Sequence, residues 1–314
     1  MEKGKILFID TAHGELRSRL EDQGFKCDYF KDYARADFLK IANNYVGIII
    51  RSKVKLDADF LSECTNLKFI GRVGAGMENI DTQFAENNGI TCLNAPEGNR
   101  DAVGEQAIGM ILTLFNNLLT ADAEVRDGIW IREGNRGYEL GGKTIGIIGY
   151  GNTGNAFARK LKGFDVEVIA YDKYKTDFSD EFVTEATMDE LYKKCDIVSL
   201  HVPLTDETKY LVNSKFINSF HNDVYVINTS RGKVLKTNDL VKNIKSGKVR
   251  GACLDVLEYE GLSFENMKLP DDVKDILTMK NVILSPHIAG WTHESNYKMA
   301  VTIAEKIKTL DFID

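Results

Sequence analysis

The sequence predicts an α/β protein of two domains, each with a parallel sheet covered by helices. Three observations predict it: the chain has 314 residues, short apolar runs alternate with helical stretches, and a glycine-rich turn separates a strand from a helix. Because one hydrophobic core rarely grows beyond about 250 residues, the length favours two domains. The alternation favours parallel strands, since each parallel return to the sheet needs a crossover.

Short apolar runs, most of them four to six residues long, predict the strands. They cover residues 6–9, 46–50, 69–70, 144–148, 166–171, 197–200, 224–228, 251–254 and 282–284. Helical spacing lies between them, for example at Leu16/Leu20 and Ile303/Ile307. The longest predicted helix, 102–126, is apolar around more than half of its circumference, which predicts burial in a core or in a dimer interface.

The composition restricts the partners that can be expected. Lys and Arg number 40 against 47 Asp and Glu, so the formal charge is −7, and neither nucleic acid nor an anionic membrane is expected as a partner. The 5 cysteines are odd in number and widely spaced, which predicts reduced thiols and no metal site. No segment has the length of a membrane span or of a signal-peptide core, so the expected compartment is the cytoplasm.

The glycine-rich turn has the context of a dinucleotide site. Gly149-Tyr150-Gly151-Asn152-Thr153-Gly154 follows a predicted strand and opens a predicted helix. In this motif the first glycine turns the chain, the second admits the pyrophosphate, and the third packs the helix on the strand. Asp172 ends the next strand, roughly 20 residues later, where a carboxylate would bind the adenosine ribose and repel a 2′-phosphate. NAD is therefore predicted over NADP, although the neighbouring Lys173 keeps NADP open.

A second glycine cluster, residues 71–76, also follows a predicted strand. It has Asn79 in place of the third glycine, and no acidic residue ends the next strand. We interpret it as a nest of backbone amides for a small carboxylate, with a plain strand–helix turn as the alternative.

Polar residues follow three strands in the second half of the chain, where ligands bind in open α/β sheets. Arg231 can clamp a carboxylate, and His287 can move a proton near neutral pH. Glu260 beside His287 would favour the charged imidazole. Each of these residues alone also has a structural or surface interpretation. Together they supply the carboxylate clamp and proton carrier that oxidation of a 2-hydroxy acid requires.

Segments spread over nearly the whole chain resemble the D-isomer-specific 2-hydroxyacid dehydrogenase family. They are, in the family's order, 71–76, 94–96, 149–154, 201–204, 228–232, 254–256 and 285–290. The resemblance implies three catalytic residues, namely Arg231, Glu260 and His287. It implies that the substrate is bound by Arg51, Ser52, Gly74, Ala75, Gly76, Arg231 and His287. It implies an NAD site made of Gly149, Gly151, Asn152, Thr153, Gly154, Asp172, His201, Val202, Pro203, Thr229, Ser230, Asp255 and Gly290.

The resemblance also implies the architecture. It predicts two Rossmann-like or flavodoxin-like domains with a cleft between them: a substrate-binding lid domain of 1–99 plus 288–314, and an NAD-binding domain of 100–287 whose long helix forms a homodimer. Two departures stand out. Glu260 precedes Gly261 where the family usually has proline, so Glu258 is the alternative glutamate. We also expect no regulatory domain after the helix near 292–310 and therefore no serine feedback.

The expected substrate is small, and its identity has alternatives. The likeness is strongest to the phosphoglycerate-oxidising members of the family, so we expect 3-phosphoglycerate and 3-phosphohydroxypyruvate, a step of serine biosynthesis. Arg51 suits the substrate phosphate but has an equal interpretation as a surface charge. Hydroxypyruvate, glyoxylate or D-lactate chemistry would use the same catalytic residues. A dinucleotide-sensing protein resembling co-repressors is an alternative of another class, because such proteins can retain those residues.

Overall fold

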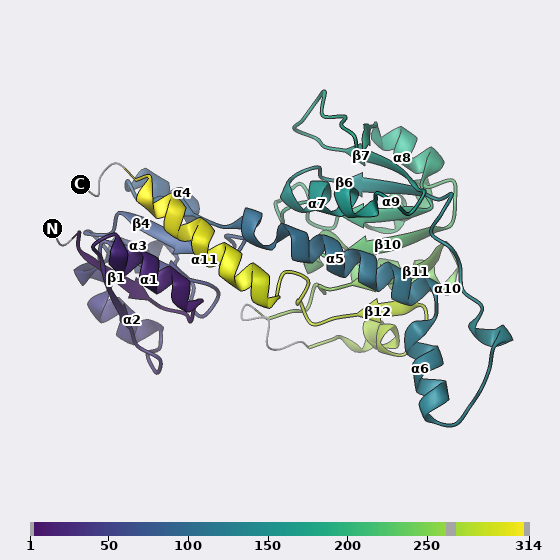
Figure 1. Ribbon diagram of the computed structural model, residues 1–314, viewed down its shortest axis with the longest axis horizontal. Coiled ribbons are helices and arrows are strands. Elements are labelled where there is room, and N and C mark those ends of the chain that lie inside the picture. The colour runs from purple at the N-terminus through teal and green to yellow at the C-terminus, as the bar shows by residue number, and fades with distance from the viewer. Residues whose placement is uncertain (1–2, 262–267, 311–314) are drawn as a thin grey trace. The chain divides into compact units, whose positions relative to one another are not determined.

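The computed structural model describes residues 3–261 and 268–310. The chain divides into two compact units, one made of Met1–Asn99 with Trp291–Asp314 and the other of Arg100–Gly290. Each unit is built on one sheet in which every pairing is parallel, which confirms the predicted α/β class (Figure 1). The end residues of the predicted substrate-binding domain, 1–2 and 311–314, lie outside the described residues.

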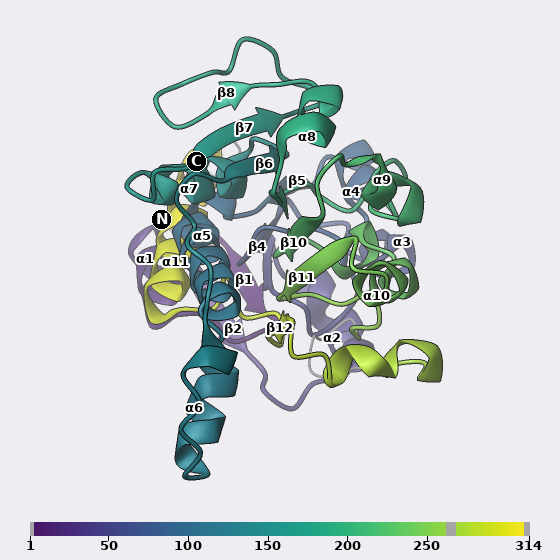
Figure 2. The same cartoon turned by 90° about the vertical axis from the view of Figure 1, so that its right-hand side faces the viewer.

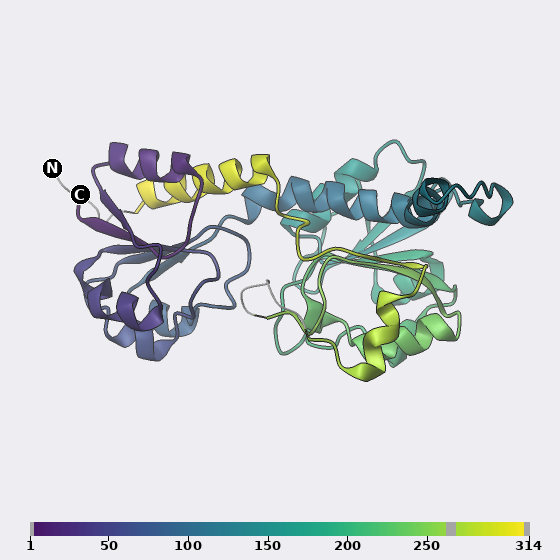
Figure 3. The ribbon, with the colours of Figure 1, turned by 90° about the horizontal axis from the view of Figure 1, so that it is seen from below.

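The first unit contains a five-stranded sheet of order β2-β1-β3-β4-β5. Its strands are β1 (Lys5–Phe8), β2 (Lys26–Tyr29), β3 (Gly47–Ile50), β4 (Phe69–Arg72) and β5 (Thr91–Leu93). Its helices are α1 (Gly14–Asp22), α2 (Arg35–Ile41), α3 (Ala58–Ser62), α4 (Thr82–Asn87) and α11 (His293–Lys308). Helices α1 and α11 cover one face through residues such as Leu20 and Ile303, and Figure 3 shows them side by side. Phe38 of α2 and Phe60 of α3 belong to the core of the other face.

The second unit contains a seven-stranded sheet of order β12-β11-β10-β9-β6-β7-β8. Its strands are β6 (Thr144–Ile148), β7 (Glu167–Tyr171), β8 (Thr184–Glu185), β9 (Ile197–Leu200), β10 (Val224–Asn228), β11 (Val249–Leu254) and β12 (Val282–Leu284). Its helices include α5 (Pro96–Phe115, from Arg100 on), α6 (Leu118–Arg126), α7 (Asn152–Leu161), α8 (Met188–Lys194), α9 (Ser214–Ser219) and α10 (Thr237–Lys245). The direction in which successive strands are added to the sheet reverses at β6, which lies between β7 and β9.

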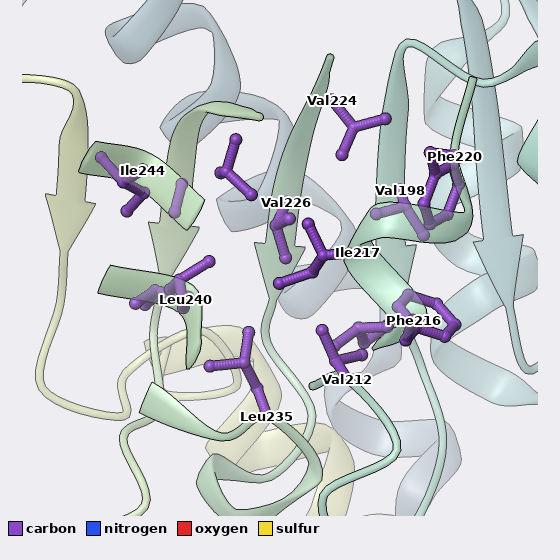
Figure 4. Close-up of a cluster of buried hydrophobic side chains, with 14 of the residues drawn as sticks. Val198, Val212, Phe216, Ile217, Phe220, Val224, Val226, Leu235, Leu240 and Ile244 are labelled. Atoms are coloured by element: carbon purple, nitrogen blue, oxygen red, sulfur yellow. The ribbon is translucent and has the colours of Figure 1, made fainter. Parts of the chain in front are cut away.

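Two apolar cores, one on each face, hold this larger sheet between its helices. On one face Val198 and Val226 of the strands pack with Phe216 of α9 and Leu240 of α10 (Figure 4). The core of the other face contains α5 and α7, through residues such as Phe157. Because the central strands β9 and β10 are buried on both faces, their sequences are mainly apolar and show no alternation, as is usual for parallel sheets.

The predicted continuous helix 102–126 is wrong, because the structure divides it into α5 and α6. Asn117 adopts a left-handed conformation, with φ 52° and ψ 30°, and this breaks the α-helical path. Asparagine tolerates that conformation better than most residues, because its short polar side chain bonds locally. Helix α5 is part of the core of its unit, whereas α6 has no buried residue and extends away from the rest of the unit (Figures 1 and 2).

Every predicted strand overlaps an observed one, and the structure adds β2, β5 and β8. All 5 cysteines are free thiols, as predicted. Within residues 3–261 and 268–310, no helix combines the length and the apolar character needed to span a bilayer.

Candidate active site

The glycine turn between β6 and α7 has a conformation that requires glycine at two positions. Gly149 has φ 93°, and a Cβ there would lie 2.6 Å from the carbonyl oxygen of His201. A Cβ on Gly154 would overlap the carbonyl oxygen of Gly149. Gly151 differs, since nothing lies within 4 Å of the place its Cβ would take. The turn is therefore packed tightly on the protein side and open where a ligand would approach.

The start of α7 is suited to a phosphate group. Its N-cap is Gly151, so no side chain bonds to the amides of the first turn. Such amides, together with the helix dipole, favour an anion. After β10, two strands away from β6 in the sheet, Thr229 Oγ1 is buried and has no hydrogen-bond partner within the described part of the chain. A hydroxyl buried in this way indicates a ligand atom as its partner. These features fit the pyrophosphate and ribose of a dinucleotide.

Asp172 lies at the end of β7 and bonds to the glycine turn. Its Oδ2 accepts from the Tyr150 amide at 2.9 Å, and its Oδ1 accepts from the Tyr174 amide at 2.9 Å. An ionised carboxylate has about four acceptor positions, so these two bonds leave capacity for ribose hydroxyls.

His201, predicted to border the cofactor, is a buried neutral side chain. Its Nε2 lies 2.8 Å from Ser199 Oγ, and its Nδ1 lies 3.2 Å from Thr153 Oγ1 of α7. Burial lowers the pKa of His201 to about 3. His201 therefore joins β9 to the first turn of α7 and is unsuited to proton transfer at neutral pH.

The structure brings His287 and Glu260 together. His287 Nδ1 lies 2.6 Å from Glu260 Oε2, and both side chains are about four-fifths buried. The second Glu260 oxygen, Oε1, accepts from the backbone amide of Leu257, which fixes the carboxylate. A carboxylate at this distance orients the imidazole and fixes which ring nitrogen carries the proton, as in other acid–base sites.

Glu258, the alternative glutamate, lies in a different environment. Its Oε2 accepts from the Thr237 amide at 2.6 Å, and its Oε1 accepts from the Tyr210 hydroxyl at 3.3 Å. Glu258 therefore binds the first amide of α10, whereas the imidazole of His287 bonds to Glu260.

Asp255, which the family resemblance implied as a cofactor residue, holds the segment that carries His287. It is 1% exposed, and Oδ1 accepts from the Ser285 hydroxyl at 2.6 Å and from the Ile288 amide at 2.9 Å. Its Oδ2 accepts from the Ala289 amide at 2.8 Å. The amide of His287 donates to the Asp255 carbonyl at 2.7 Å. Asp255 thus determines the position of His287 through the backbone.

Arg231 follows β10, beside the segment that carries Glu260. Its Nη1 donates to the Ser230 carbonyl at 2.7 Å, while its own carbonyl accepts from Asn228 Nδ2 at 3.1 Å. The next residue, Gly232, packs so closely on the backbone of Leu257 that a Cβ would overlap it. The neighbouring strands β10 and β11 thereby bring the Arg231 and Glu260 segments together.

The remaining predicted cofactor residues of this unit lie near the same strand ends. Asn152 Oδ1 accepts from Arg100 Nη1 at 3.5 Å, and the Pro203 carbonyl accepts from Thr208 Oγ1 at 2.6 Å. Val202 lies next to Gly149. Gly290 is the last residue of the unit.

The predicted substrate residues Arg51, Ser52 and Gly74–Gly76 belong to the first unit. Asp10, which the sequence reasoning missed, holds the 51–53 segment: its Oδ2 accepts from the amides of Arg51 at 2.6 Å and Ser52 at 2.9 Å. The Arg51 guanidinium lies over the ring of Trp291, 3.9 Å from its centroid. Only the apolar run before Asp10, which predicted a strand ending there, could have indicated such a role.

Gly74 anchors the predicted amide nest. Its φ is 157°, its amide donates to the Arg72 carbonyl, and its carbonyl accepts from the Ala95 amide at 2.8 Å. Asn94 Nδ2 donates to the Ala75 carbonyl at 2.7 Å. The segments 71–76 and 94–96, which carried the resemblance, are thus hydrogen-bonded to each other.

The second unit has the features of a dinucleotide-binding α/β domain, with its glycine turn at the point where strand order reverses. Residues 108–289 match the family model described as the NAD binding domain of D-isomer specific 2-hydroxyacid dehydrogenases. The chain belongs to this family, and NAD(H) is its cofactor, as predicted.

Three similar proteins illustrate the range of the family. A hydroxypyruvate reductase of Thermotoga maritima is 36% identical over 86% of each chain. A D-3-phosphoglycerate dehydrogenase of Archaeoglobus fulgidus is 33% identical over 96% of this chain, which spans 56% of that protein's length. The crystal structure of a glyoxylate reductase from Paecilomyes thermophila matches with a TM-score of 0.87 at 25% identity, over 98% of this chain and 95% of that one.

Proposed function

We propose that this protein interconverts a D-2-hydroxy acid and its 2-keto acid, with 3-phosphoglycerate and 3-phosphohydroxypyruvate as the preferred pair. The observation that carries the reaction is the bond between His287 Nδ1 and Glu260 Oε2 at 2.6 Å, within the family's NAD-binding domain. The chemistry that NAD supplies when bound is hydride transfer. The glycine turn, Asp172 and Thr229 are the residues that would hold it.

The side chains of the protein supply binding and proton transfer. With Nδ1 held by Glu260, His287 would exchange a proton through Nε2. It takes the hydroxyl proton of the 2-hydroxy acid in oxidation and donates a proton to the carbonyl oxygen in reduction. Arg231 would bind the substrate carboxylate, because a guanidinium offers two parallel hydrogen bonds to it.

The amide nest at Gly74–Gly76 and Arg51 are proposed as further substrate contacts. The Gly74 amide donates to the Arg72 carbonyl, so the amides of Ala75 and Gly76 would supply the anion site. Arg51 is proposed to bind the distal phosphate of the three-carbon substrate. Its guanidinium plane, supported by Trp291 at 3.9 Å, offers a phosphate several donors in a fixed geometry.

Hydroxypyruvate is the second candidate substrate. The observation that favours it is the hydroxypyruvate reductase of Thermotoga maritima, which has the highest identity of the three relatives above and matches over 86% of its own length.

A substrate panel tests the proposal. We expect NADH oxidation with kcat/KM highest for 3-phosphohydroxypyruvate, followed by hydroxypyruvate, glyoxylate and pyruvate. Arg51→Ala should lower kcat/KM for 3-phosphohydroxypyruvate by roughly tenfold or more, since a charged hydrogen bond contributes about 1.5–3 kcal/mol, while glyoxylate is little affected. Lys55→Ala, which removes an exposed cation of the same unit, is the matched control. If hydroxypyruvate has the highest kcat/KM, and Arg51→Ala lowers kcat/KM equally for 3-phosphohydroxypyruvate and glyoxylate, the second candidate is the substrate. Inactivity on all keto acids would favour a dinucleotide-sensing protein.

We also propose that the protein is a homodimer whose interface contains α6. The arm formed by α6 and the following segment exposes large apolar side chains, among them Leu119 at 61% and Trp130 at 79% exposure. So many large exposed apolar side chains on one short segment indicate an interaction site. A second copy of the chain is the proposed occupant, because a dimer formed through this helix is what the family resemblance implies.

A further inference from the structure

Two loops flank the glycine turn, and one ion pair joins them. Because β6 lies between β7 and β9, the segments after β7 and β9 stand on either side of the turn. Lys173 belongs to the first segment and Glu207 to the second. Lys173 Nζ lies 2.8 Å from Glu207 Oε1. The hydroxyl of Tyr174 donates to Glu207 Oε2, so both oxygens of this carboxylate are engaged by residues that follow Asp172.

We propose that Glu207 is a specificity-determining residue, which favours NAD over NADP by keeping Lys173 from the adenosine 2′-position. Lys173 directly follows Asp172, the carboxylate at the ribose end of the site. A lysine beside that position would attract a 2′-phosphate and partly offset the repulsion from Asp172. The ion pair with Glu207 neutralises this lysine and directs it to the opposite loop.

The contacts of the residues that follow Lys173 support this placement of the lysine. The Tyr174 amide donates to Asp172 Oδ1 at 2.9 Å, so the chain on both sides of Lys173 is fixed by its neighbours. Lys175, the next cation, is directed to the Tyr150 carbonyl, to which its Nζ donates at 2.7 Å. Both lysines that follow Asp172 thus have partners within the protein.

Both members of the ion pair carry their charge at neutral pH. The hydrogen bond from Lys173 lowers the pKa of Glu207, and the same bond raises the pKa of Lys173. Their side chains are half exposed, at 54% and 55%, so salt screens the pair. We therefore expect a modest change in cofactor preference and not a complete exchange, with Asp172 still excluding most NADP. The inference rests on the family's NAD-binding domain and is independent of the proposed substrate.

A single and a double variant, with cofactor binding as the readout, test the role of Glu207. Glu207→Gln should tighten the Kd for NADPH about two- to fivefold, as expected for an exposed charge pair, and leave the Kd for NADH within about twofold. The gain should shrink as the salt concentration rises from about 0.05 to 0.5 M. Adding Lys173→Met to Glu207→Gln should abolish the gain, because the cation that binds the 2′-phosphate is then absent.

Glu181→Gln is the matched control. It removes an exposed carboxylate that pairs with Lys162 at the same 2.8 Å in the same unit, so it changes the net charge equally. Its NADPH affinity should remain at the wild-type value, and thermal melts should show that all variants are folded. The proposal is overturned if Glu207→Gln leaves the NADPH affinity unchanged, if it tightens NADH and NADPH equally, or if the gain persists with Lys173→Met.

Discussion

His287 has a backbone conformation that residues other than glycine seldom adopt, with φ 55°. Such a conformation persists only where the surroundings hold it, and here Asp255 bonds to the residues on both sides. The side chain is held separately by Glu260. Two carboxylates thus fix the imidazole: Asp255 holds the backbone of the segment, and Glu260 holds the ring.

Replacing Glu260 by glutamine tests the proton relay. The change keeps the shape of the side chain but replaces the carboxylate oxygen that holds the imidazole ring. A ring in the wrong tautomer or orientation transfers the substrate proton poorly, so kcat should fall by about tenfold or more in both directions, while NADH binding is retained. The measurements are kcat in both directions and the Kd for NADH.

Glu258→Gln serves as the control for this experiment. Because Glu258 bonds to the Thr237 amide and to the Tyr210 hydroxyl, its replacement should lower thermal stability and leave kcat unchanged. A loss of kcat with Glu258→Gln and none with Glu260→Gln would show that the wrong glutamate had been assigned.

His201 should make stability depend on pH. Its pKa is about 3 in the folded chain against an ordinary value of 6.5, so between these limits the unfolded chain binds a proton that the folded chain does not. The free energy of unfolding should fall as the pH decreases below 6.5, by about 1.4 kcal/mol per pH unit from this group. In denaturant titrations from pH 7 to 5, the free energy of unfolding should change less with pH in His201→Asn than in the wild type. His221→Asn, at an exposed position, should show the wild-type dependence on pH. The same dependence in all three proteins would contradict the assignment.

At the scale of elements, sequence reasoning found the central strands and the edge strand β12 and missed the other three edge strands. The predicted runs are mainly apolar because most of their residues are buried, whereas β2, β5 and β8 lie at sheet edges and are partly exposed. A segment such as Lys26–Tyr29, with a single fully buried residue, has no apolar run to detect. The division of the long helix at Asn117 was also missed, because the apolar spacing typical of a helix continues on both sides of the break.

The joint between β6 and α7 gives a prediction at this scale. Gly154→Ala places a Cβ against the Gly149 carbonyl, so α7 must shift, and we expect a loss of about 1–3 kcal/mol in stability together with weaker NADH binding. Gly151→Ala has open space around its Cβ, so it should weaken NADH binding alone, by narrowing the approach of the pyrophosphate. Thermal melts and NADH fluorescence titrations measure both effects. Equal stability of the two variants would contradict the packing role of Gly154.

At the scale of the whole molecule, the exposed arm predicts assembly. Wild-type protein should sediment with twice the 35.2 kDa mass of the chain. Leu119→Glu combined with Trp130→Glu should shift it to the monomer, because charges in an apolar interface must be desolvated. Leu277→Glu, at an exposed apolar residue elsewhere in the same unit, is the control and should leave the mass unchanged. A monomeric wild type would overturn the dimer proposal.

The sequence by itself determined the parallel α/β class, the family, the NAD turn at Gly149 and the candidate residues Arg231, Glu260 and His287. These features are readable because each depends on residues that are close together along the chain: a glycine spacing, an apolar run, or a polar residue directly after a strand. The choice of Glu260 over Glu258 already needed more, because both follow the same strand and only the contacts of each carboxylate separate them.

Only the tertiary structure decided which distant residues hold those candidates in place. Asp10 bonds to the Arg51 segment, Asp255 to the His287 segment, and Glu207 to Lys173, each across a separation of about 30 residues or more. Such partners are determined by the order of strands in the sheet, which brings the ends of neighbouring strands together whatever their distance along the chain. Local periodicity predicts each strand, but the order in which the strands pair, and hence the side chains that meet at their ends, is a property of the folded sheet.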